Sequence, residues 1–255
     1  MSDYQRDIDV DNLWVTIQQE ARDIVQSQPL LASFYQKHIL SRGSLSDALC
    51  SVLAEKLVDV QGDEHEWHAF LCSLVQQSEN IAQALTKDLL CQLESNASIK
   101  DHSTPLLYFG GYQALQSYRF AHFCWQNAMQ PMANYIQGKV VAVFGVDIHP
   151  AAKIGQGIFL DHAVGIVVGE TAVVEDDVTL FQSVTLGGTG KGQGDRHPKV
   201  RKGAFIGSGA VIFGNIEIGQ NAKVAGGAVV VKSVAPNTTV VGTLAQPVGR
   251  KENKS

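Results

Sequence analysis

A repeat of six residues constrains this chain more than any other feature of its sequence. Apolar residues recur at every sixth position from Ile148, and the series resumes after one gap; its members are Ile148, Ile154, Leu160, Ile166, Ala172, Val178 and Val184, then Val200, Ile206, Ile212, Ile218, Val224 and Val230. Such a period does not fit an amphipathic α-helix, whose apolar residues recur every 3–4 positions. It fits a parallel β-helix, in which each hexapeptide supplies one short strand and a turn, and three hexapeptides make a triangular coil. The pattern predicts about four coils.

The chain divides into two unlike parts. Residues 1–138 hold 5 of the 24 glycines and have a net charge of -8, whereas residues 139–255 hold the other 19 and have a net charge of +3. Apolar residues in the first part follow helical spacing over 13–25, 67–75, 81–90 and 112–127. Ser103-Thr104-Pro105 is typical of a helix start, with a hydroxyl cap and a proline in the first turn. We expect an α+β chain: an all-helical domain over 1–138, a β-helix over 139–249 and a disordered charged tail over 250–255.

Composition narrows the class of protein. The chain is 45% apolar and 18% charged, which is globular, and its net charge of -5 favours neither nucleic acid nor an anionic membrane as a partner. It lacks an apolar run of about 18 residues that would span a bilayer, and its start does not resemble a signal peptide. We therefore expect a cytoplasmic protein. Its four cysteines lack CxxC spacing and are interpreted as buried thiols rather than as metal ligands or disulfides: Cys50, Cys72, Cys91 and Cys124.

One loop interrupts the repeat. Residues 190–199 carry three glycines, three basic residues and one histidine. Solenoids commonly place binding chemistry in such insertions, on one face of a rigid scaffold. We expect this loop to be functional rather than a tolerated surface insertion.

The motifs on the repeat resemble those of one enzyme family. Asp-Ile-His-Pro-Ala-Ala-Lys-Ile-Gly at 147–155, Leu-Asp-His-Ala-Val-Gly at 160–165 and Gly-Asp-Arg-His-Pro at 194–198 resemble the serine O-acetyltransferases of cysteine biosynthesis. Ser-Thr-Pro-Leu-Leu-Tyr at 103–108 resembles the last N-terminal helices of that family. The resemblance implies a left-handed β-helix that transfers the acetyl group of acetyl-CoA to the hydroxyl of L-serine, giving O-acetyl-L-serine and CoA. It implies no tightly bound cofactor.

A serine hydroxyl needs a general base to act as a nucleophile, and histidine is the usual base near neutral pH. The β-helix part contains His149, His162 and His197. The resemblance implies a catalytic dyad of Asp147 and His162, in which the carboxylate orients the imidazole. These two residues are 15 positions apart, close to one coil, so they could approach each other from successive coils. His149 lies in an Ile-His-Pro turn and is interpreted as structural.

The resemblance also implies how the amino acid binds. Asp161 would hold the α-ammonium, Arg196 and His197 would hold the α-carboxylate, and Glu170 would pair with the loop. One position departs from the family pattern, because residues 95–98 read Ser-Asn-Ala-Ser where the family has Asp-Pro-Ala. Asn96 therefore replaces an aspartate that helps to hold the ammonium, which leaves the affinity for serine and the identity of the acceptor open.

Acetyl-CoA would lie in a groove between neighbouring β-helices. The matching turn residues are Gly188, Thr189, Ser208 and Gly226, whose small side chains admit the pantetheine to the backbone, and Lys223 and Lys232 are candidates for contacting phosphates. The family forms trimers joined in pairs and is inhibited by L-cysteine. Many members bind O-acetylserine sulfhydrylase through a tail that ends in isoleucine. Residues 250–255 have no apolar anchor, so we expect no complex through this tail.

Alternative functions remain open at this point. The chain could be an acetyltransferase for a different hydroxyl or amine acceptor, or a non-catalytic assembly module that docks through its acidic helical part. A zinc site of the carbonic anhydrase type needs a histidine spacing that His149, His162 and His197 do not have. Glu-His-Glu-Trp-His at 64–68 is one residue short of the HExxH zinc motif, so His65 and His68 are interpreted as ordinary helix residues and no metal is expected.

Overall fold

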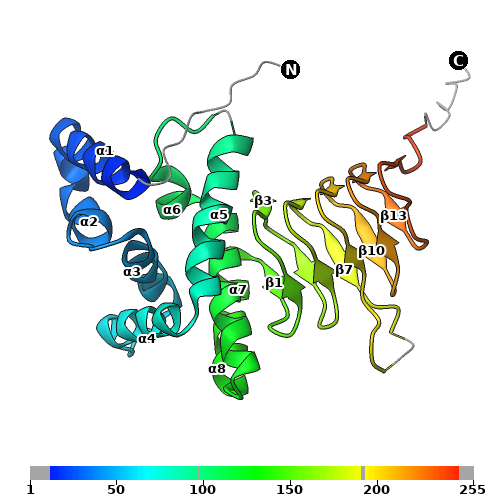
Figure 1. The fold of residues 1–255 in the computed structure, drawn as a ribbon, viewed down its shortest axis with the longest axis horizontal. Coiled ribbons are helices and arrows are strands. Elements are labelled where there is room, and N and C mark those ends of the chain that lie inside the picture. Colours follow the sequence, from blue (N-terminus) through cyan, green and yellow to red (C-terminus); the bar gives the residue numbers. More distant parts are fainter. Residues whose placement is uncertain (1–11, 97, 191–192, 247–255) are drawn as a thin grey trace, which may run out of the picture.

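The computed structural model describes residues 12–96, 98–190 and 193–246. Helices occupy one end of an elongated molecule and a stack of short parallel strands occupies the other (Figure 1). The tail predicted over 250–255 lies outside the described residues. In the described part of the chain, no helix is long and apolar enough to cross a membrane.

The helical part confirms the predicted helices and adds three that were not predicted, over residues 32–35, 45–57 and 130–144. Its helices are α1 (Leu13–Ser27), α2 (Ala32–Tyr35), α3 (Leu45–Leu57), α4 (Glu64–Gln77), α5 (Glu79–Ser95), α6 (Thr104–Tyr108), α7 (Gly110–Gln126) and α8 (Gln130–Phe144). A 3₁₀ turn (Pro29–Leu31) and a π turn (Gln36–Leu40) flank α2. Helix α3 escaped prediction because most of its residues are buried, so it has no polar face to mark a period.

Two details of the helical part differ from expectation. The Ser103 hydroxyl does not cap α6; it donates to Asp101 Oδ1, which also accepts the Thr104 N–H at 2.8 Å, so Asp101 does the capping. The expected domain boundary at 138 falls inside α8, which continues to Phe144. The helix ends on Gly145, whose left-handed φ of 65° is typical of a helix C-terminus.

The strand part is a parallel β-helix with three sheets, as predicted. Sheet 1 contains β1 (Asp147–Ile148), β4 (Val167–Val168), β7 (Thr185–Gly187), β10 (Val211–Phe213) and β13 (Val229–Val230). Sheet 2 contains β2 (Lys153–Ile154), β5 (Val173–Val174), β8 (Lys199–Val200) and β11 (Glu217–Ile218). Sheet 3 contains β3 (Phe159–Asp161), β6 (Thr179–Phe181), β9 (Phe205–Ile206), β12 (Lys223–Val224) and β14 (Thr239–Val240). These described strands make nearly five coils, more than the four expected.

The predicted frame of the repeat is wrong between Leu160 and Val200, and it is correct from Val200 to Val230. Ile148 pairs with Val168, 20 residues later, whereas Val168 pairs with Leu186, 18 residues later. Two extra residues therefore lie between β3 and β4, and the inward strand positions become Val168, Val174, Leu180 and Leu186. The predicted strand positions Ile166, Ala172, Val178 and Val184 are buried between strands instead. Sequence could not separate the two series, because both point into the prism and both are apolar.

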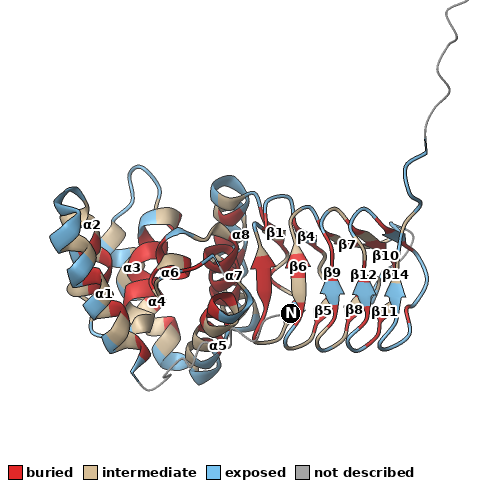
Figure 2. Ribbon diagram, turned by 90° about the horizontal axis from the view of Figure 1, so that it is seen from above, coloured by how far each residue is buried: buried red, intermediate tan, exposed pale blue. Residues whose placement is uncertain are grey.

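A continuous buried core connects the two parts, as the red segments of Figure 2 show. Helix α7 lies against β3 because its second residue is glycine. A Cβ on Gly111 would lie 2.3 Å from the Leu160 carbonyl oxygen and 3.1 Å from Ala163 Cβ. Next to this contact, Arg119 pairs with the buried Asp88 at 2.6 Å and donates to the Gly155 carbonyl at 2.7 Å. The helical part is thereby fixed against the first coil.

Candidate active site

The predicted site residues lie at two different corners of the triangular prism. The first, called the 3–1 corner, consists of the turns that lead from sheet 3 to sheet 1 and includes His162. The second, called the 1–2 corner, consists of the turns that lead from sheet 1 to sheet 2 and includes Glu170 and residues 188–190 and 193–198. The two corners are the opposite edges of sheet 1.

At the 3–1 corner, a strained turn projects His162 outward. His162 and Ala163 have φ values of 56° and 62°, a left-handed conformation that costs non-glycine residues about 1–2 kcal/mol each. The Gly165 N–H donates to the Gly145 carbonyl at 2.7 Å and holds the turn against the end of α8. The His162 side chain is 76% exposed. The two extra residues of the repeat thus form the turn that presents this imidazole.

A cavity of about 340 Å³ opens beside His162 and gathers three of the predicted residues. Asp161, His162 and Asn96 line it together with Tyr108 and Gly111. Asp161 Oδ1 lies 3.8 Å from His162 Nε2. Carboxylate and imidazole therefore face one small space, as binding and deprotonating an amino alcohol requires.

Asn96 ends α5 and enters this cavity without a charge. Its Oδ1 accepts hydrogen bonds from the Ser98 N–H at 3.0 Å and the Ser98 hydroxyl at 2.6 Å. The amide oxygen, the only part of Asn96 suited to an ammonium, is therefore already engaged by its own chain.

Sequence analysis missed Gln92, which lines the same cavity. Its side chain is 1% exposed, and its Nε2 has no hydrogen-bond partner among the described residues. A buried donor left unpaired costs about 1–3 kcal/mol, and a ligand acceptor in the cavity would relieve that cost. A signal was present: Gln92 follows Leu85 and Leu89 on the apolar face of α5, where a polar residue is unusual.

Asp147 belongs to the same corner but has a different partner. Its N–H donates to the Ile166 carbonyl at 2.9 Å, directly beside the His162 turn. Its carboxylate accepts from Gln137 Nε2 of α8 at 2.7 Å. The Asp147–His162 dyad stays a prediction, because the described residues show no contact between these two side chains; the carboxylate keeps acceptor sites beside the bond from Gln137.

At the 1–2 corner, the predicted pairing of Glu170 with the loop is confirmed. Arg196 Nη2 donates to Glu170 Oε2 at 2.6 Å, and this bond lowers the pKa of the Glu170 carboxyl. Arg196 Nη1 donates to the Gly194 carbonyl at 3.1 Å. The guanidinium is thus held at two points before any ligand arrives.

Thr171, which sequence analysis did not select, organises His197. Its hydroxyl accepts the N–H groups of Arg196 and His197 at 3.0 and 3.1 Å and lies 2.8 Å from His197 Nδ1. The Thr171 N–H also donates to Nδ1, at 3.2 Å. Nδ1 is therefore an acceptor, and the proton of the neutral ring resides on Nε2.

His197 is held neutral and in place. It is 7% exposed, and burial together with the nearby Arg196 charge lowers its pKa. A Cβ on Gly169 would lie 2.0 Å from the His197 ring, so the ring occupies space that only glycine leaves. Neighbouring His149 packs edge-on against Trp125 at 5.2 Å and accepts the Ala151 N–H, which agrees with the structural role expected for it.

The residues expected to bind acetyl-CoA also divide between the corners. Ser208 and Gly226 are exposed in successive turns of the 3–1 corner, where the Gly227 N–H donates to the Ser208 carbonyl at 2.8 Å. Lys223 is exposed on β12 and Lys232 is exposed after β13. Gly188 and Thr189 begin the loop at the 1–2 corner. A larger cavity of about 630 Å³, between α5, α7 and the first coils, contains none of the predicted site residues.

One chain therefore does not gather the complete set. Asp161 and His162 lie at one edge of sheet 1, and Arg196 and His197 lie at the other. The same separation divides the three β-helix histidines, since His162 stands apart from His149 and His197. A three-histidine zinc site within one chain is not formed by the described residues.

Comparison with known proteins identifies the family. Residues 13–117 match the family model "Serine acetyltransferase, N-terminal". The serine acetyltransferase of Salmonella typhimurium is 46% identical over 245 residues, which cover 93% of this chain and 87% of that protein. The chain belongs to the serine acetyltransferase family. The predicted acyltransferase class is thereby confirmed, in preference to a non-catalytic assembly module.

Solved structures of serine acetyltransferases share the whole fold. The enzyme from Vibrio cholerae superposes with a TM-score of 0.89 at 45% identity, covering 95% of this chain and 94% of that one. The Brucella abortus enzyme, solved with coenzyme A, superposes with a TM-score of 0.89 at 39% identity, covering 95% of this chain and 98% of that one. The soybean enzyme, solved with serine, superposes with a TM-score of 0.88 at 42% identity, covering 92% of this chain and 97% of that one. The predicted architecture of a helical part followed by a left-handed β-helix is confirmed.

Proposed function

We propose that this member of the serine acetyltransferase family acetylates L-serine from acetyl-CoA at a site shared by neighbouring chains, with His162 as the general base. The observation that carries the proposal is the division of complementary groups between the two corners. One corner offers a carboxylate and an exposed imidazole, and the other offers a fixed guanidinium and a neutral imidazole. The coenzyme A bound to the Brucella enzyme and the serine bound to the soybean enzyme support both substrates.

His162 would act first as a base and then as an acid. Nε2 removes the hydroxyl proton of serine while the serine oxygen attacks the thioester carbonyl carbon of acetyl-CoA. The tetrahedral intermediate then collapses, its carbon–sulfur bond breaks, and the imidazolium returns the proton to the CoA sulfur. Asp147 at the same corner would orient the ring and stabilise its charged form, while Gln137 holds the carboxylate in place. Because His162 is exposed in a single chain, a neighbour is needed to exclude water.

Serine would be held by opposite charges from two chains. Asp161 takes the α-ammonium, and Arg196 with the Nε2–H of His197 from the next chain takes the α-carboxylate. Glu170 and Thr171 position the two carboxylate-binding groups before serine arrives, so little ordering remains at the moment of binding.

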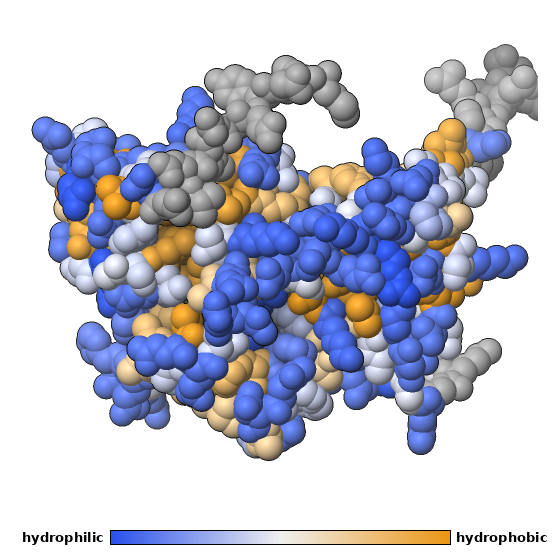
Figure 3. Space-filling model, in the orientation of Figure 1, coloured by the Kyte–Doolittle hydropathy of each residue, from blue (hydrophilic) through white to orange (hydrophobic). Residues whose placement is uncertain are grey.

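The outward face of sheet 1 supports a trimer. In a single chain it carries the exposed Val167 and Val229 and the half-buried Val211, whereas the outward face of sheet 2 carries Lys153, Lys199 and Glu217. Apolar residues reach the surface of the β-helix among polar ones in Figure 3. Burial of the valines against the next chain would favour association. Three prisms in a ring would set the 3–1 corner of each chain against the 1–2 corner of its neighbour, and the helical parts would join two such rings.

Acetyl-CoA would occupy the groove between these corners. Ser208 and Gly226 would line one wall and Gly188 and Thr189 the other, with Lys223 near the phosphates. Small residues at these turns would leave backbone donors and acceptors accessible to the pantetheine amides.

Mixed assemblies test the shared site. His162→Ala and Arg196→Ala chains, each inactive alone, are unfolded together and refolded into mixed trimers. A shared site predicts recovered activity, because each mixed trimer contains one interface with both native residues. The matched control mixes His162→Ala with Asp161→Ala, two changes at the same corner, and should recover nothing. Recovery in neither mixture would refute the shared site.

A second acceptor is favoured by one observation, the uncharged Asn96. A hydroxyl or amine substrate other than serine would need less charge in this cavity. Thiol release from acetyl-CoA, measured with the amino acids, homoserine and simple sugars, distinguishes the two cases. Serine should give the highest kcat/KM, and a higher value for another acceptor would replace serine in the proposal.

A further inference from the structure

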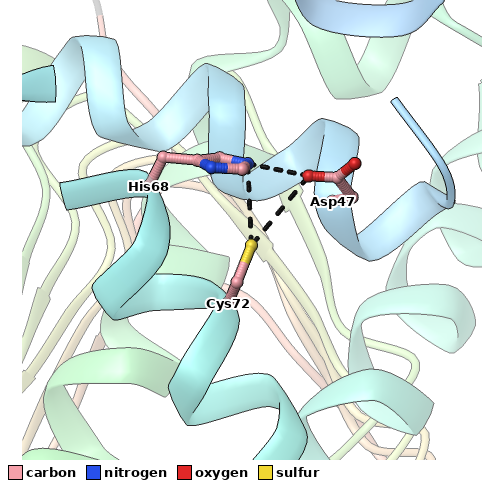
Figure 4. A group of neighbouring side chains, drawn as sticks. All are labelled: Asp47, His68 and Cys72. Carbon is pink, nitrogen blue, oxygen red and sulfur yellow. Dashed lines mark hydrogen bonds and ion pairs between the residues drawn. The ribbon is translucent and has the colours of Figure 1, made fainter. Parts of the chain in front are cut away.

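Three donor side chains meet between α3 and α4, in the helical part and away from both corners (Figures 1 and 4). Asp47 lies in the first turn of α3, and His68 and Cys72 are four residues apart on α4, so these two share one helix face. His68 Nε2 lies 2.7 Å from Asp47 Oδ1 and 3.6 Å from Cys72 Sγ. Cys72 Sγ lies 4.0 Å from Asp47 Oδ1.

We propose that Asp47, His68 and Cys72 bind a zinc ion, with water as the fourth ligand. Zinc in proteins takes carboxylate, imidazole and thiolate ligands in a tetrahedron, at distances that place the ligand atoms about 3.3–3.8 Å apart. The three separations here are 2.7, 3.6 and 4.0 Å, so small side-chain rotations suffice to admit the ion.

Surrounding backbone orients the carboxylate ligand. The Gly43 N–H donates to Asp47 Oδ2 at 2.9 Å, which leaves Oδ1 directed at His68. The Asp47 N–H donates to the Ser44 hydroxyl, the N-cap of α3, and fixes the first turn. Hydrogen bonds to a ligand's second atom are typical of built metal sites, because they fix the direction of the first.

The charges around the cluster can balance a cation. The positive charge of Arg42 would repel the ion, since its Nη1 lies 3.4 Å from His68 Nε2. Its Nε donates to the Lys37 carbonyl at 2.7 Å and anchors the side chain. Only the Nη1 end has to move when the ion enters. The Asp47 carboxylate and a Cys72 thiolate supply two negative charges, which would balance the charge of the zinc ion. Asp47 and His68 are 29% and 23% exposed, so the ion can enter from solvent.

The role of this site would be to join α3 to α4. No residue of the cluster lines the cavity beside His162. The site therefore does not depend on the proposed acetyl transfer, and binding of zinc would add to the stability of the folded chain by mass action.

Cobalt provides the test, because tetrahedral Co²⁺ with thiolate ligands gives visible d–d bands and a near-ultraviolet charge-transfer band. The full-length protein, reduced and freed of metal, is titrated with Co²⁺ and then with Zn²⁺. We expect one Co²⁺ per chain, displacement by Zn²⁺, and a Zn²⁺-dependent rise in Tm.

Variants separate the site from adventitious binding. Cys72→Ser should abolish the charge-transfer band and the rise in Tm, and His68→Gln should weaken affinity about tenfold or more. Cys91→Ser, which removes a half-buried thiol from α5, should change neither. Circular dichroism verifies that each variant is folded. Absence of the bands in the folded wild type, or their persistence in Cys72→Ser, would overturn the proposal.

Discussion

The two corners of the β-helix differ in how complete they are within one chain. At the 1–2 corner, Arg196 and His197 are each held by several hydrogen bonds, and Thr171 alone makes four of them. At the 3–1 corner, His162 stands exposed on a strained turn, and Asp147 and Asn96 are engaged by neighbours in their own chain. In the proposed shared site, the half that would bind the carboxylate is thus assembled within one chain, whereas the half that would hold the base would be completed by a partner chain.

The largest expected effect is at the 3–1 corner. His162→Ala should lower kcat by about 10²–10⁴-fold, since the general base is removed, and should leave folding intact because the side chain is exposed. Steady-state thiol release and thermal unfolding measure the two quantities. Asp147→Asn should lower kcat less than His162→Ala does, because the base remains but is poorly oriented. Near-normal turnover of His162→Ala would remove this residue from the mechanism.

At the 1–2 corner, Thr171→Val should damage binding rather than turnover. It leaves two N–H groups and His197 Nδ1 without their hydroxyl partner. We therefore expect the KM for serine to rise about 10–100-fold. The KM for acetyl-CoA should change little. Thr189→Val, a threonine change at the start of the same loop, is the control for serine binding. If both variants raised the serine KM equally, Thr171 would have no special role.

Arg196→Lys tests the same difference between serine binding and acetyl-CoA binding, and its effect on the serine KM should be smaller. Lysine keeps the charge but lacks the planar fork that grips a carboxylate, so the serine KM should rise about tenfold. Acetyl-CoA binding should be nearly unaffected. Equal damage to both substrates would mean that the loop shapes the whole groove. Serine methyl ester, which lacks the carboxylate, should be a poor substrate of the wild type.

The lowered pKa of His197 predicts a pH effect on stability at the 1–2 corner. Below its ordinary pKa of 6.5 the unfolded chain binds a proton that the folded ring resists, so this histidine destabilises the fold as the pH falls. The free energy of unfolding of wild type minus that of His197→Gln should be constant above about pH 7.5 and should decrease below pH 6.5. Denaturant unfolding at a series of pH values measures it. A constant difference down to pH 5 would contradict a lowered pKa.

The smallest effect concerns Asn96 at the 3–1 corner. We expect L-cysteine to inhibit by occupying the serine site, but weakly, because Asn96 supplies no charge for the ammonium. Asn96→Asp should lower the inhibition constant of L-cysteine severalfold. Inhibition curves of the wild type and the variant would measure this change. Ser98→Ala, which removes one of the two hydrogen bonds to the Asn96 oxygen without adding charge, is the control. No tightening in Asn96→Asp would place residue 96 outside the site.

Sequence patterns determined much of the fold because they are local. Repetition of buried branched residues at every sixth position requires coils that stack, and apolar residues at helical spacing require a packed helix face. Individual side chains were also found from motifs: Asp161, His162 and Asn96 do meet in one cavity, and Glu170 does pair with Arg196.

Tertiary structure alone decided the contacts between segments. The frame after Leu160 depended on the length of one turn, because the two possible series are equally apolar. Thr171, Gln92 and Asp101 gained their roles from neighbours distant in the sequence or from the exact path of the backbone. Asp47, His68 and Cys72 meet because α3 packs against α4. A pattern states which side chains are buried, but which atoms meet depends on turn lengths and helix packing, and these are set only when the whole chain folds.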